Sequence, residues 1–477
     1  MQSNRSDSAS RYLSFPPEAA DTRPDSKLAI HKWEIETLSN LLLTTPKQKE
    51  SSGRNRILNC SRFEAVTAVI NLLRNLEDAE AGVVLEQSKI FRELHRIGQR
   101  QFGWQRGYFN TSRLYRYAFI YGQGECSSHF QTSFGISYNE FSLIGFALHA
   151  AFRETPSVRR AASLGSLGIS QKTVDAILSL ISTPIENARD QAPALLDNTA
   201  RAYGGLLPVA YYPSFLRRHP IVTFDNGSRL RAPLPELIML RTTSGVYYDL
   251  ISGPSHLRND ASERFEKYCV ACLSATKPSF EVCRREKYAW KGQTVETPDI
   301  LVRVGGKVKI ALECKATKLT FDAQFSKEPI SDAKIGYEEI AKGVFQLWRY
   351  LSHARRGIAA DIDYSSDLFG VVLTLDTWLV ASRELQQDVF AIANKKADKD
   401  REIVDSDRIK VAFCAIEDFE QLLLRSTPES FWRCFRWLVK IGSPAGCCRI
   451  FTVTLKKNQH HGRNILLIPV TCCRGGR

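Results

Sequence analysis

The chain has 477 residues, enough for two or three domains of ordinary size. Its composition, with 43% hydrophobic, 24% charged and 10% aromatic residues, is that of a globular protein and excludes a fibre or a wholly disordered chain. The 65 Lys and Arg against 51 Asp and Glu give a net charge of +14. This excess favours a polyanionic partner such as nucleic acid, and the alternative is a solvated positive surface.

No run of about 20 apolar residues is present, so we expect no membrane span. Residues 1–26 are rich in Ser, Asp, Arg and Pro and lack the apolar centre of a signal peptide, which predicts a disordered tail. The 12 cysteines are scattered, mostly in apolar stretches, as is typical of free thiols in a reducing compartment. We therefore expect a cytoplasmic protein.

Residues 27–205 have the apolar periodicity of a mostly helical region. Residues 102–134 interleave aromatics with arginines, which is typical of nucleic-acid stacking surfaces and equally of a core edged by arginines. Residues 157–180 resemble a helix-turn-helix, with Ser170 capping a second helix that would present Gln171, Lys172 and Asp175. The alternative is a helical hairpin within a bundle.

Residues 206–255 contain short strands and predict a connecting region with a hairpin around Asn226-Gly227. From 256 to 425 helices and strands alternate, which predicts an α/β domain with a central mixed sheet flanked by helices. Among these elements, residues 279–288 are predicted to form a single strand. Residues 426–477 form a C-terminal extension. The expected class is therefore α+β, with helices in the first half.

Two neighbouring strands, 299–304 and 308–315, carry the most informative residues. Side chains alternate between the two faces of a strand, so Glu313 and Lys315 project from the same side at the end of the second strand. Asp299 begins the first strand.

The loop between these strands decides whether Asp299 meets Glu313. A two-residue loop at Gly305-Gly306 would place Asp299 on the wrong face. A three-residue loop that includes Lys307, or a β-bulge with the same effect, pairs the two carboxylates on one face. We predict the three-residue loop or such a bulge.

Paired carboxylates form a site for a hard cation such as Mg²⁺ or Mn²⁺, and the backbone carbonyl of Cys314 can add a further oxygen. Lys315 would then orient the attacking water or offset charge in the transition state. The alternative for Glu313 and Lys315 is an ion pair at an exposed strand end.

Pro298-Asp299 followed by Glu313-Cys314-Lys315 resembles the PD-(D/E)xK nuclease superfamily. The resemblance covers roughly residues 259–424 and implies a restriction-endonuclease-like fold. It implies that an acid on the preceding helix completes the metal site. Glu266 is the expected residue, with Glu263 as the alternative.

Downstream, Gln346 and Tyr350 fit the Q-x-x-x-Y helix of the RecB-like exonuclease branch of that superfamily. The alternative is an ordinary amphipathic helix. Residues four apart share a helix face, and Lys342 shares it too, where it could contact phosphate. The resemblance therefore implies that Gln346 and Tyr350 belong to the catalytic site.

Together these features predict a metal-dependent nuclease that acts on nucleic acid, with DNA favoured over RNA as the substrate. The architecture resembles that of effectors of prokaryotic restriction or anti-phage defence, in which the helical half would bind a partner protein, a second copy or a trigger. Two alternatives stay open: a nuclease that cleaves tRNA or other RNA, and a nucleic-acid-binding regulator whose nuclease fold no longer cuts.

Overall fold

The computed structural model of the chain describes residues 29–45, 63–84, 90–108, 110–160, 169–250, 253–359, 363–377, 379 and 382–433. They form two compact units: residues up to 261 together with 320–327, and the remainder from 262 onward. The division falls close to the predicted boundary at 255. The predicted tail, the first helix of the helix-turn-helix pattern and residues 434–477 of the C-terminal extension lie outside the described residues.

The first unit is mostly helical, as predicted. Its longer helices are α2 (Lys32–Thr44), α3 (Phe63–Val84), α4 (Ile90–Arg106), α5 (Thr111–Tyr121), α6 (Gly124–Phe134), α7 (Tyr138–Glu154), α8 (Gln171–Ile181), α9 (Ile185–Tyr203), α10 (Glu236–Thr242) and α11 (Val246–Leu250). A small sheet accompanies them, with β1 (Val158–Arg159), β2 (Ser182–Pro184), β3 (Ile221–Phe224) and β4 (Arg229–Arg231) in the order β1-β4-β3-β2. The predicted hairpin is the antiparallel pair β3–β4, whose turn contains Asn226 and Gly227 with positive φ.

Part of the aromatic and basic stretch 102–134 belongs to the core. Trp104, Tyr117 and Tyr121 are buried, and so are the guanidinium-bearing residues Arg113 and Arg116. Side chains buried in this way cannot stack on a nucleic-acid strand, so the structure supports the core interpretation of these residues.

The second helix of the predicted helix-turn-helix is α8, and the hydroxyl of Ser170 caps it by accepting from the backbone N–H of Thr173. Asp175, one of its predicted groove-facing residues, forms an ion pair with Arg160.

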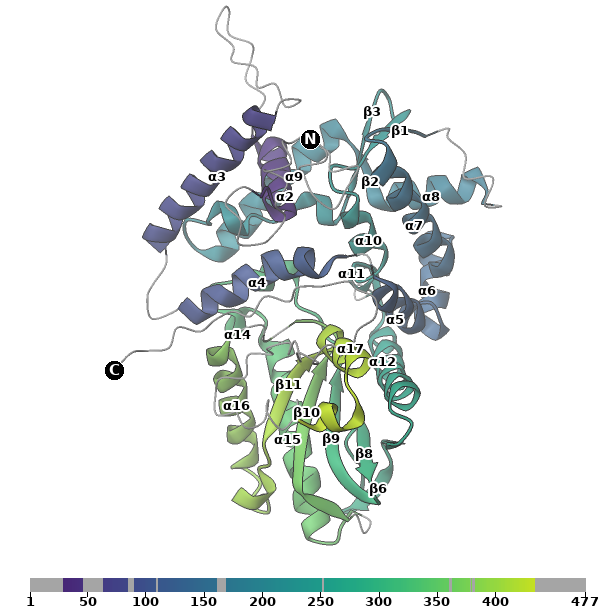
Figure 1. The fold of residues 1–477 in the computed structure, drawn as a ribbon, viewed down its shortest axis with the longest axis vertical. Helices are drawn as coiled ribbons and strands as arrows, with labels where there is room; N and C mark the ends of the chain where they lie inside the picture. The colour runs from purple at the N-terminus through teal and green to yellow at the C-terminus, as the bar shows by residue number, and fades with distance from the viewer. Residues whose placement is uncertain are drawn as a thin grey trace, which may run out of the picture. The chain divides into compact units, whose positions relative to one another are not determined.

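The second unit is built on a five-stranded mixed sheet in the order β11-β10-β9-β8-β5 (Figure 1). Strands β9, β10 and β11 are parallel to one another, whereas β8 runs antiparallel to β9 and to β5. The strands are β5 (Glu281–Arg284), β8 (Ile300–Val304), β9 (Lys307–Lys315), β10 (Tyr364–Thr374) and β11 (Val411–Ala415). The predicted central mixed sheet is confirmed.

One predicted strand is in fact two. Residues 279–288 were expected to form a single strand, but β5 ends at Arg284 and the chain turns into a separate hairpin. This hairpin pairs β6 (Lys287–Trp290) with β7 (Gln293–Glu296) around Lys291 and Gly292, both with positive φ. The expectation was wrong because β6 pairs with β7 and does not extend the main sheet. The composition of residues 279–288 does not show which strand they will pair with.

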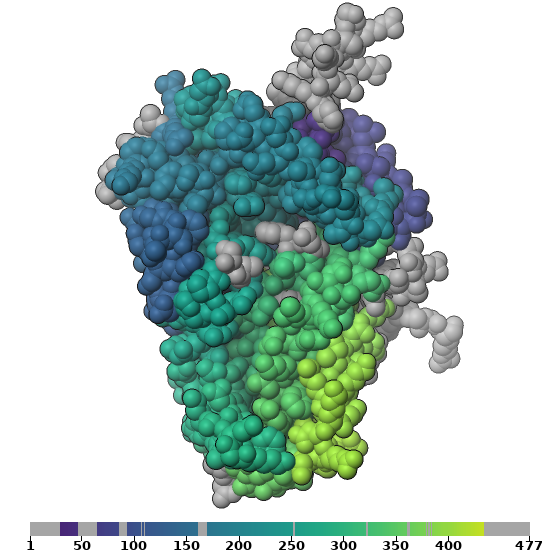
Figure 2. Space-filling view, turned by 180° about the vertical axis from the view of Figure 1, so that it is seen from behind, coloured from purple at the N-terminus to yellow at the C-terminus, as the bar shows by residue number. Residues whose placement is uncertain are grey.

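Helices flank the sheet and complete the second unit. They are α12 (Ser255–Thr276, which begins in the first unit), α14 (Pro329–Asp332), α15 (Lys334–Arg355), α16 (Arg383–Ala397), the short 3-10 helix η6 (Asp405–Asp407) and α17 (Ile416–Arg425). Helix α15 packs against β10, where the methyl group Cδ1 of Leu347 would lie 2.8 Å from a Cβ at Gly370. Figure 2 shows one face of this unit, where the surface runs from the teal residues near its start, through green, to the yellow-green residues near its end.

Within the described ranges, no helix is both long enough and apolar enough to cross a membrane. The six cysteines of those ranges are free thiols, as expected.

Gly370 gives a direct test of the packing between α15 and the sheet. An added methyl group would also lie 3.0 Å from Cγ2 of Val411, so Gly370→Ala should destabilise the second unit by about 1–3 kcal/mol. The matched control is Gly82→Ala in α3, where a Cβ meets nothing within 4 Å and helix propensity favours Ala by up to about 1 kcal/mol. Urea unfolding of both variants measures the difference, and equal stability of the two would contradict this packing.

Candidate active site

A β-bulge sets the register between β8 and β9. Val304 pairs with Lys307, so the loop is the two-residue Gly305-Gly306 turn, and the predicted three-residue loop is wrong. Both glycines have positive φ, as the primed turns of tight hairpins require. The register then shifts, because Arg303 pairs with Val308 and Val302 with Ile310.

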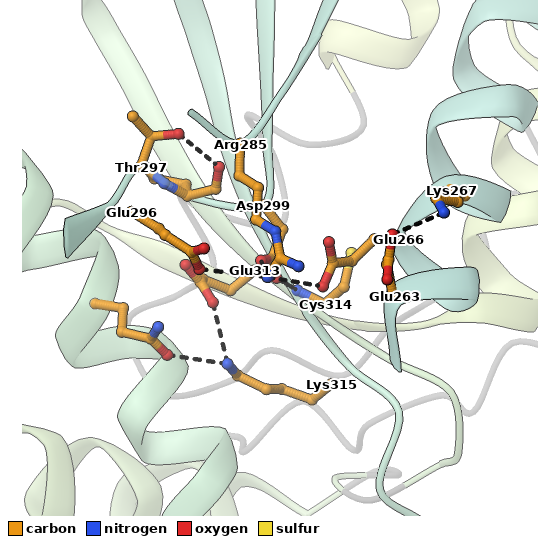
Figure 3. A network of polar contacts seen from close by, with 12 residues as sticks. Glu263, Glu266, Lys267, Arg285, Glu296, Thr297, Asp299, Glu313, Cys314 and Lys315 are labelled. Carbon is orange, nitrogen blue, oxygen red and sulfur yellow. Dashed lines mark hydrogen bonds and ion pairs between the residues drawn. The ribbon is translucent and has the colours of Figure 1, made fainter. Parts of the chain in front are cut away.

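Lys309 is therefore the extra residue of the bulge, which was the predicted alternative to the longer loop. Beyond the bulge Ile300 lies opposite Leu312, and continuing this register places Asp299 opposite Glu313. The two carboxylates thus approach one another at the same end of the two strands, as Figure 3 shows.

Glu313 and Lys315 form a buried ion pair at the end of β9. The ammonium Nζ of Lys315 lies 3.0 Å from Oε2 of Glu313, and it donates a second hydrogen bond of 3.0 Å to Oε1 of Gln346 on α15. Only 2% of Glu313 is exposed, so the alternative of an exposed strand-end pair is wrong. The predicted residue Gln346 holds the ammonium against the sheet.

A glycine lets α15 approach these side chains closely. A Cβ at Gly343 would lie 2.8 Å from Cε of Lys315 and 3.5 Å from Cβ of Glu313. Gly343 therefore provides the space that the stem of Lys315 occupies.

Asp299 is tied to β9 through its carboxylate. Its Oδ2 accepts a hydrogen bond of 2.7 Å from the backbone N–H of Cys314. This contact holds Asp299 beside Glu313, in the register that the bulge sets.

Helix α12 contributes Glu266 and not Glu263. The side chain of Glu266 is 7% exposed and faces Asp299, and its Oε2 has no hydrogen-bond partner among the described residues. Glu263 is about half exposed and forms an ion pair of 2.7 Å with Lys267. Of the two acids that the resemblance allowed, only Glu266 reaches the carboxylate cluster, by which we mean Glu266, Asp299 and Glu313.

The sequence interpretation missed two residues of the site. Nη1 of Arg285 lies 3.4 Å from Glu266, 3.4 Å from Glu296 and 3.9 Å from Asp299, and Figure 3 shows its guanidinium among these acids. Arg285 and Glu296 stand at the base of the β6–β7 hairpin, which was itself not predicted. No sequence pattern marks them.

Burial and mutual repulsion raise the pKa values of the carboxylate cluster. Desolvation, followed by the charges of Asp299 and Glu266, raises the pKa of Glu313 to about 8 despite the ammonium of Lys315. Burial and the charge of Asp299 raise the pKa of Glu266 to about 7. Burial also raises the pKa of Asp299, although Lys315 and the N–H of Cys314 oppose it. Burial lowers the pKa of Lys315, but Glu313 and Asp299 outweigh it, so this pKa is raised.

Two further predicted residues lie apart from the cluster. Tyr350 is 3% exposed. Besides burial, the polar and charged groups that shift the pKa of its hydroxyl belong to the β5–β6 and β8 segments, and none of them is a member of the carboxylate cluster. Lys342 is about half exposed and forms an ion pair of 3.5 Å with Glu339. The structure therefore brings Gln346 to Lys315 but does not bring Tyr350 or Lys342 there.

The donor chemistry of the cluster is that of a hard-cation site, because it offers three carboxylates. In the described ranges, however, no three His, Cys, Asp or Glu side chains are already arranged around one position for a metal ion. Arg285 and Lys315 stand among the carboxylate oxygens as counter-ions.

Comparisons of the chain with protein-family models, curated proteins and solved structures gave no match.

The raised pKa values predict how stability depends on pH in EDTA. Glu313 and Glu266 bind protons in the folded chain at pH values where the unfolded chain has released them, so their contribution to the free energy of unfolding falls as pH rises from about 5 to 8. Each such proton contributes about 1.4 kcal/mol per pH unit. Glu313→Gln should make this decline shallower, measured by urea unfolding at several pH values. The exposed Glu281→Gln is the control, and parallel curves for wild type and Glu313→Gln would refute the prediction.

Proposed function

We propose that the chain is a metal-dependent nuclease that hydrolyses phosphodiester bonds, with DNA the favoured substrate. The observation that carries the proposal is the convergence of Glu266, Asp299 and Glu313 beside Lys315. Four residues from one helix and two strands meet there, and the ammonium is held by Gln346. A solvated surface or an ordinary core would not bury three acids together.

The carboxylate cluster fits Mg²⁺ or Mn²⁺ in its chemistry. Asp299, Glu313 and Glu266 with the backbone carbonyl of Cys314 would hold the ion, and the unpartnered Oε2 of Glu266 is a buried oxygen that a cation would satisfy. A bound divalent ion supplies Lewis-acid activation of the phosphodiester and of the attacking water.

Lys315 has the position that the proposed reaction needs. Two of the three donors of its ammonium are used by Glu313 and Gln346, which leaves one for a water or a phosphate oxygen. Its raised pKa keeps it cationic, so it can offset negative charge that develops on the phosphate. Glu313 orients the ammonium and limits its motion.

The net charge of +14 supports attraction to a phosphate backbone, with affinity that falls steeply as salt increases. The free thiols of the described ranges fit a reducing cytoplasm. We assign to the helical first unit the recognition of a partner, a second copy or a trigger, as in restriction or anti-phage effectors.

One observation favours a second candidate, a nucleic-acid-binding protein of the same fold that no longer cuts. The carboxylates already have Arg285 and Lys315 as counter-ions, so the cluster does not need a metal to be stable. The two candidates differ in whether a metal ion produces cleavage.

We expect the purified chain to cut nucleic acid with Mg²⁺ or Mn²⁺ and to be inactive in EDTA. Supercoiled plasmid, linear duplex, single-stranded DNA and total RNA are tested in parallel. Asp299→Asn and Lys315→Met should each lower the rate about 100-fold or more, because each removes a charge from the reacting centre while keeping the side-chain volume.

The matched controls are Asp363→Asn and Lys307→Ala. These residues form an exposed ion pair of 3.3 Å, and its loss should leave the rate unchanged. Cleavage of RNA alone would shift the proposal to the RNA nuclease. Metal-independent binding without any cutting, unchanged in Asp299→Asn, would instead support the silent nucleic-acid-binding protein.

Gly343→Ala tests whether the position of Lys315 matters for cleavage. The new methyl group would meet Cε of Lys315, which is flexible, so the ammonium should shift away from Glu313 and Gln346. Cleavage should fall by about 10- to 100-fold, and the free energy of unfolding should fall by about 1–3 kcal/mol, because the buried contacts of Lys315 with Glu313 and Gln346 loosen. Gly82→Ala should change neither rate nor fold. A fully active Gly343→Ala would show that the position of Lys315 is not critical.

A further inference from the structure

Arg285 lies within 4 Å of three acids. Its Nη1 lies 3.4 Å from Oε1 of Glu266, 3.4 Å from Oε2 of Glu296 and 3.9 Å from Oδ1 of Asp299. Elsewhere in the second unit Arg355 holds Asp407 through two hydrogen bonds of 2.8 and 2.9 Å. Arg285 thus makes no such two-pronged pair and is shared loosely among three acids, so no single carboxylate retains it strongly.

The backbone beside Arg285 is fixed while its side chain is partly exposed. The N–H of Arg285 donates to the carbonyl of Asp299 at 3.0 Å, and Glu286 and Thr297 exchange hydrogen bonds of 2.9 and 3.0 Å at the base of the hairpin. The side chain is one-third exposed. Its guanidinium therefore has a fixed anchor and can still change partners.

The three acids around it differ in exposure. Glu266 and Asp299 have side chains that are 7% and 11% exposed, whereas Glu296 is 42% exposed. The guanidinium thus bridges a buried pair, which the proposed function assigns to the metal, and an outer carboxylate at the rim (Figure 3).

We propose that Arg285 is the internal counter-ion of the metal-free site, that a divalent cation binds by displacing it from Glu266 and Asp299, and that Glu296 retains the displaced guanidinium. This inference rests on the proposed function, because it assumes that Glu266 and Asp299 receive a metal. A cation at these oxygens would repel a guanidinium a few ångströms away, so the two cannot share the acids. The metal-free protein gains stability from Arg285, and the same contact weakens metal binding.

The test measures Mn²⁺ binding to the full chain by calorimetry and by electron paramagnetic resonance, without nucleic acid. Arg285→Gln should bind Mn²⁺ about tenfold more tightly than wild type, because one competing positive charge is lost. Arg285→Lys keeps the charge and should stay near wild type. Glu296→Gln should bind several-fold more weakly, because the displaced guanidinium loses its outer partner.

Arg303→Gln is the matched control. Arg303 is 31% exposed and lies 3.4 Å from the exposed Glu281, so its loss should leave Mn²⁺ binding unchanged. In EDTA, Arg285→Gln should lower the melting temperature, and Mn²⁺ should raise it by more than in wild type.

The outcomes distinguish a failure of this inference from a failure of the proposed metal-dependent function. If wild type binds Mn²⁺, Asp299→Asn does not, and Arg285→Gln binds equally or more weakly than wild type, Arg285 is no competitor and the inference fails while the metal site stands. Binding by Arg285→Gln alone would support displacement in its strongest form. If neither wild type nor Arg285→Gln binds Mn²⁺, both the metal-dependent function and the inference are overturned.

Discussion

A single extra residue in β9 determines which side chains of β8 and β9 meet. The Gly305-Gly306 turn by itself would place Asp299 opposite Leu312, because side chains alternate strictly along paired strands. Lys309 adds one residue to β9 without a partner in β8, and every residue beyond it moves to the opposite face relative to β8. Asp299 then faces Glu313 and not an apolar side chain. The contacts of the carboxylate cluster depend on this shift.

Burying three acids together is costly, and the structure offsets the cost locally. Lys315 forms an ion pair with Glu313, and the N–H of Cys314 donates a hydrogen bond to Asp299. The partly exposed Arg285 forms an ion pair with Glu266. The compensation is incomplete, because the pKa values of Glu313 and Glu266 stay raised to about 8 and about 7. An incompletely compensated cluster gains more from a bound cation than a well-paired one, since less is lost when its internal partners move.

Much of the site could be predicted from the sequence, because alternation along a strand places Glu313 and Lys315 on one side whatever surrounds them. The class of the fold follows in the same way from apolar periodicity. The choice between Glu266 and Glu263 depends on the rotation of α12, which packing decides. Arg285 and Glu296 were missed because residues 279–288 have the composition of one strand, and only the pairing of β6 with β7 bends the chain there. Tyr350 was misplaced because a shared helix face does not fix where a hydroxyl points.

The sequence also did not predict the path of the chain between β9 and α15. Residues 320–327 leave the second unit and fold with the first, where Phe325 stacks on Tyr211 at 5.9 Å and the ammonium of Lys327 lies 4.3 Å from the ring centroid of Tyr203. The two elements that this excursion joins carry Lys315 and Gln346, and the hydrogen bond between these residues closes the loop. The segment that joins Lys315 to Gln346 along the chain therefore belongs in part to the first unit, although both residues lie in the second.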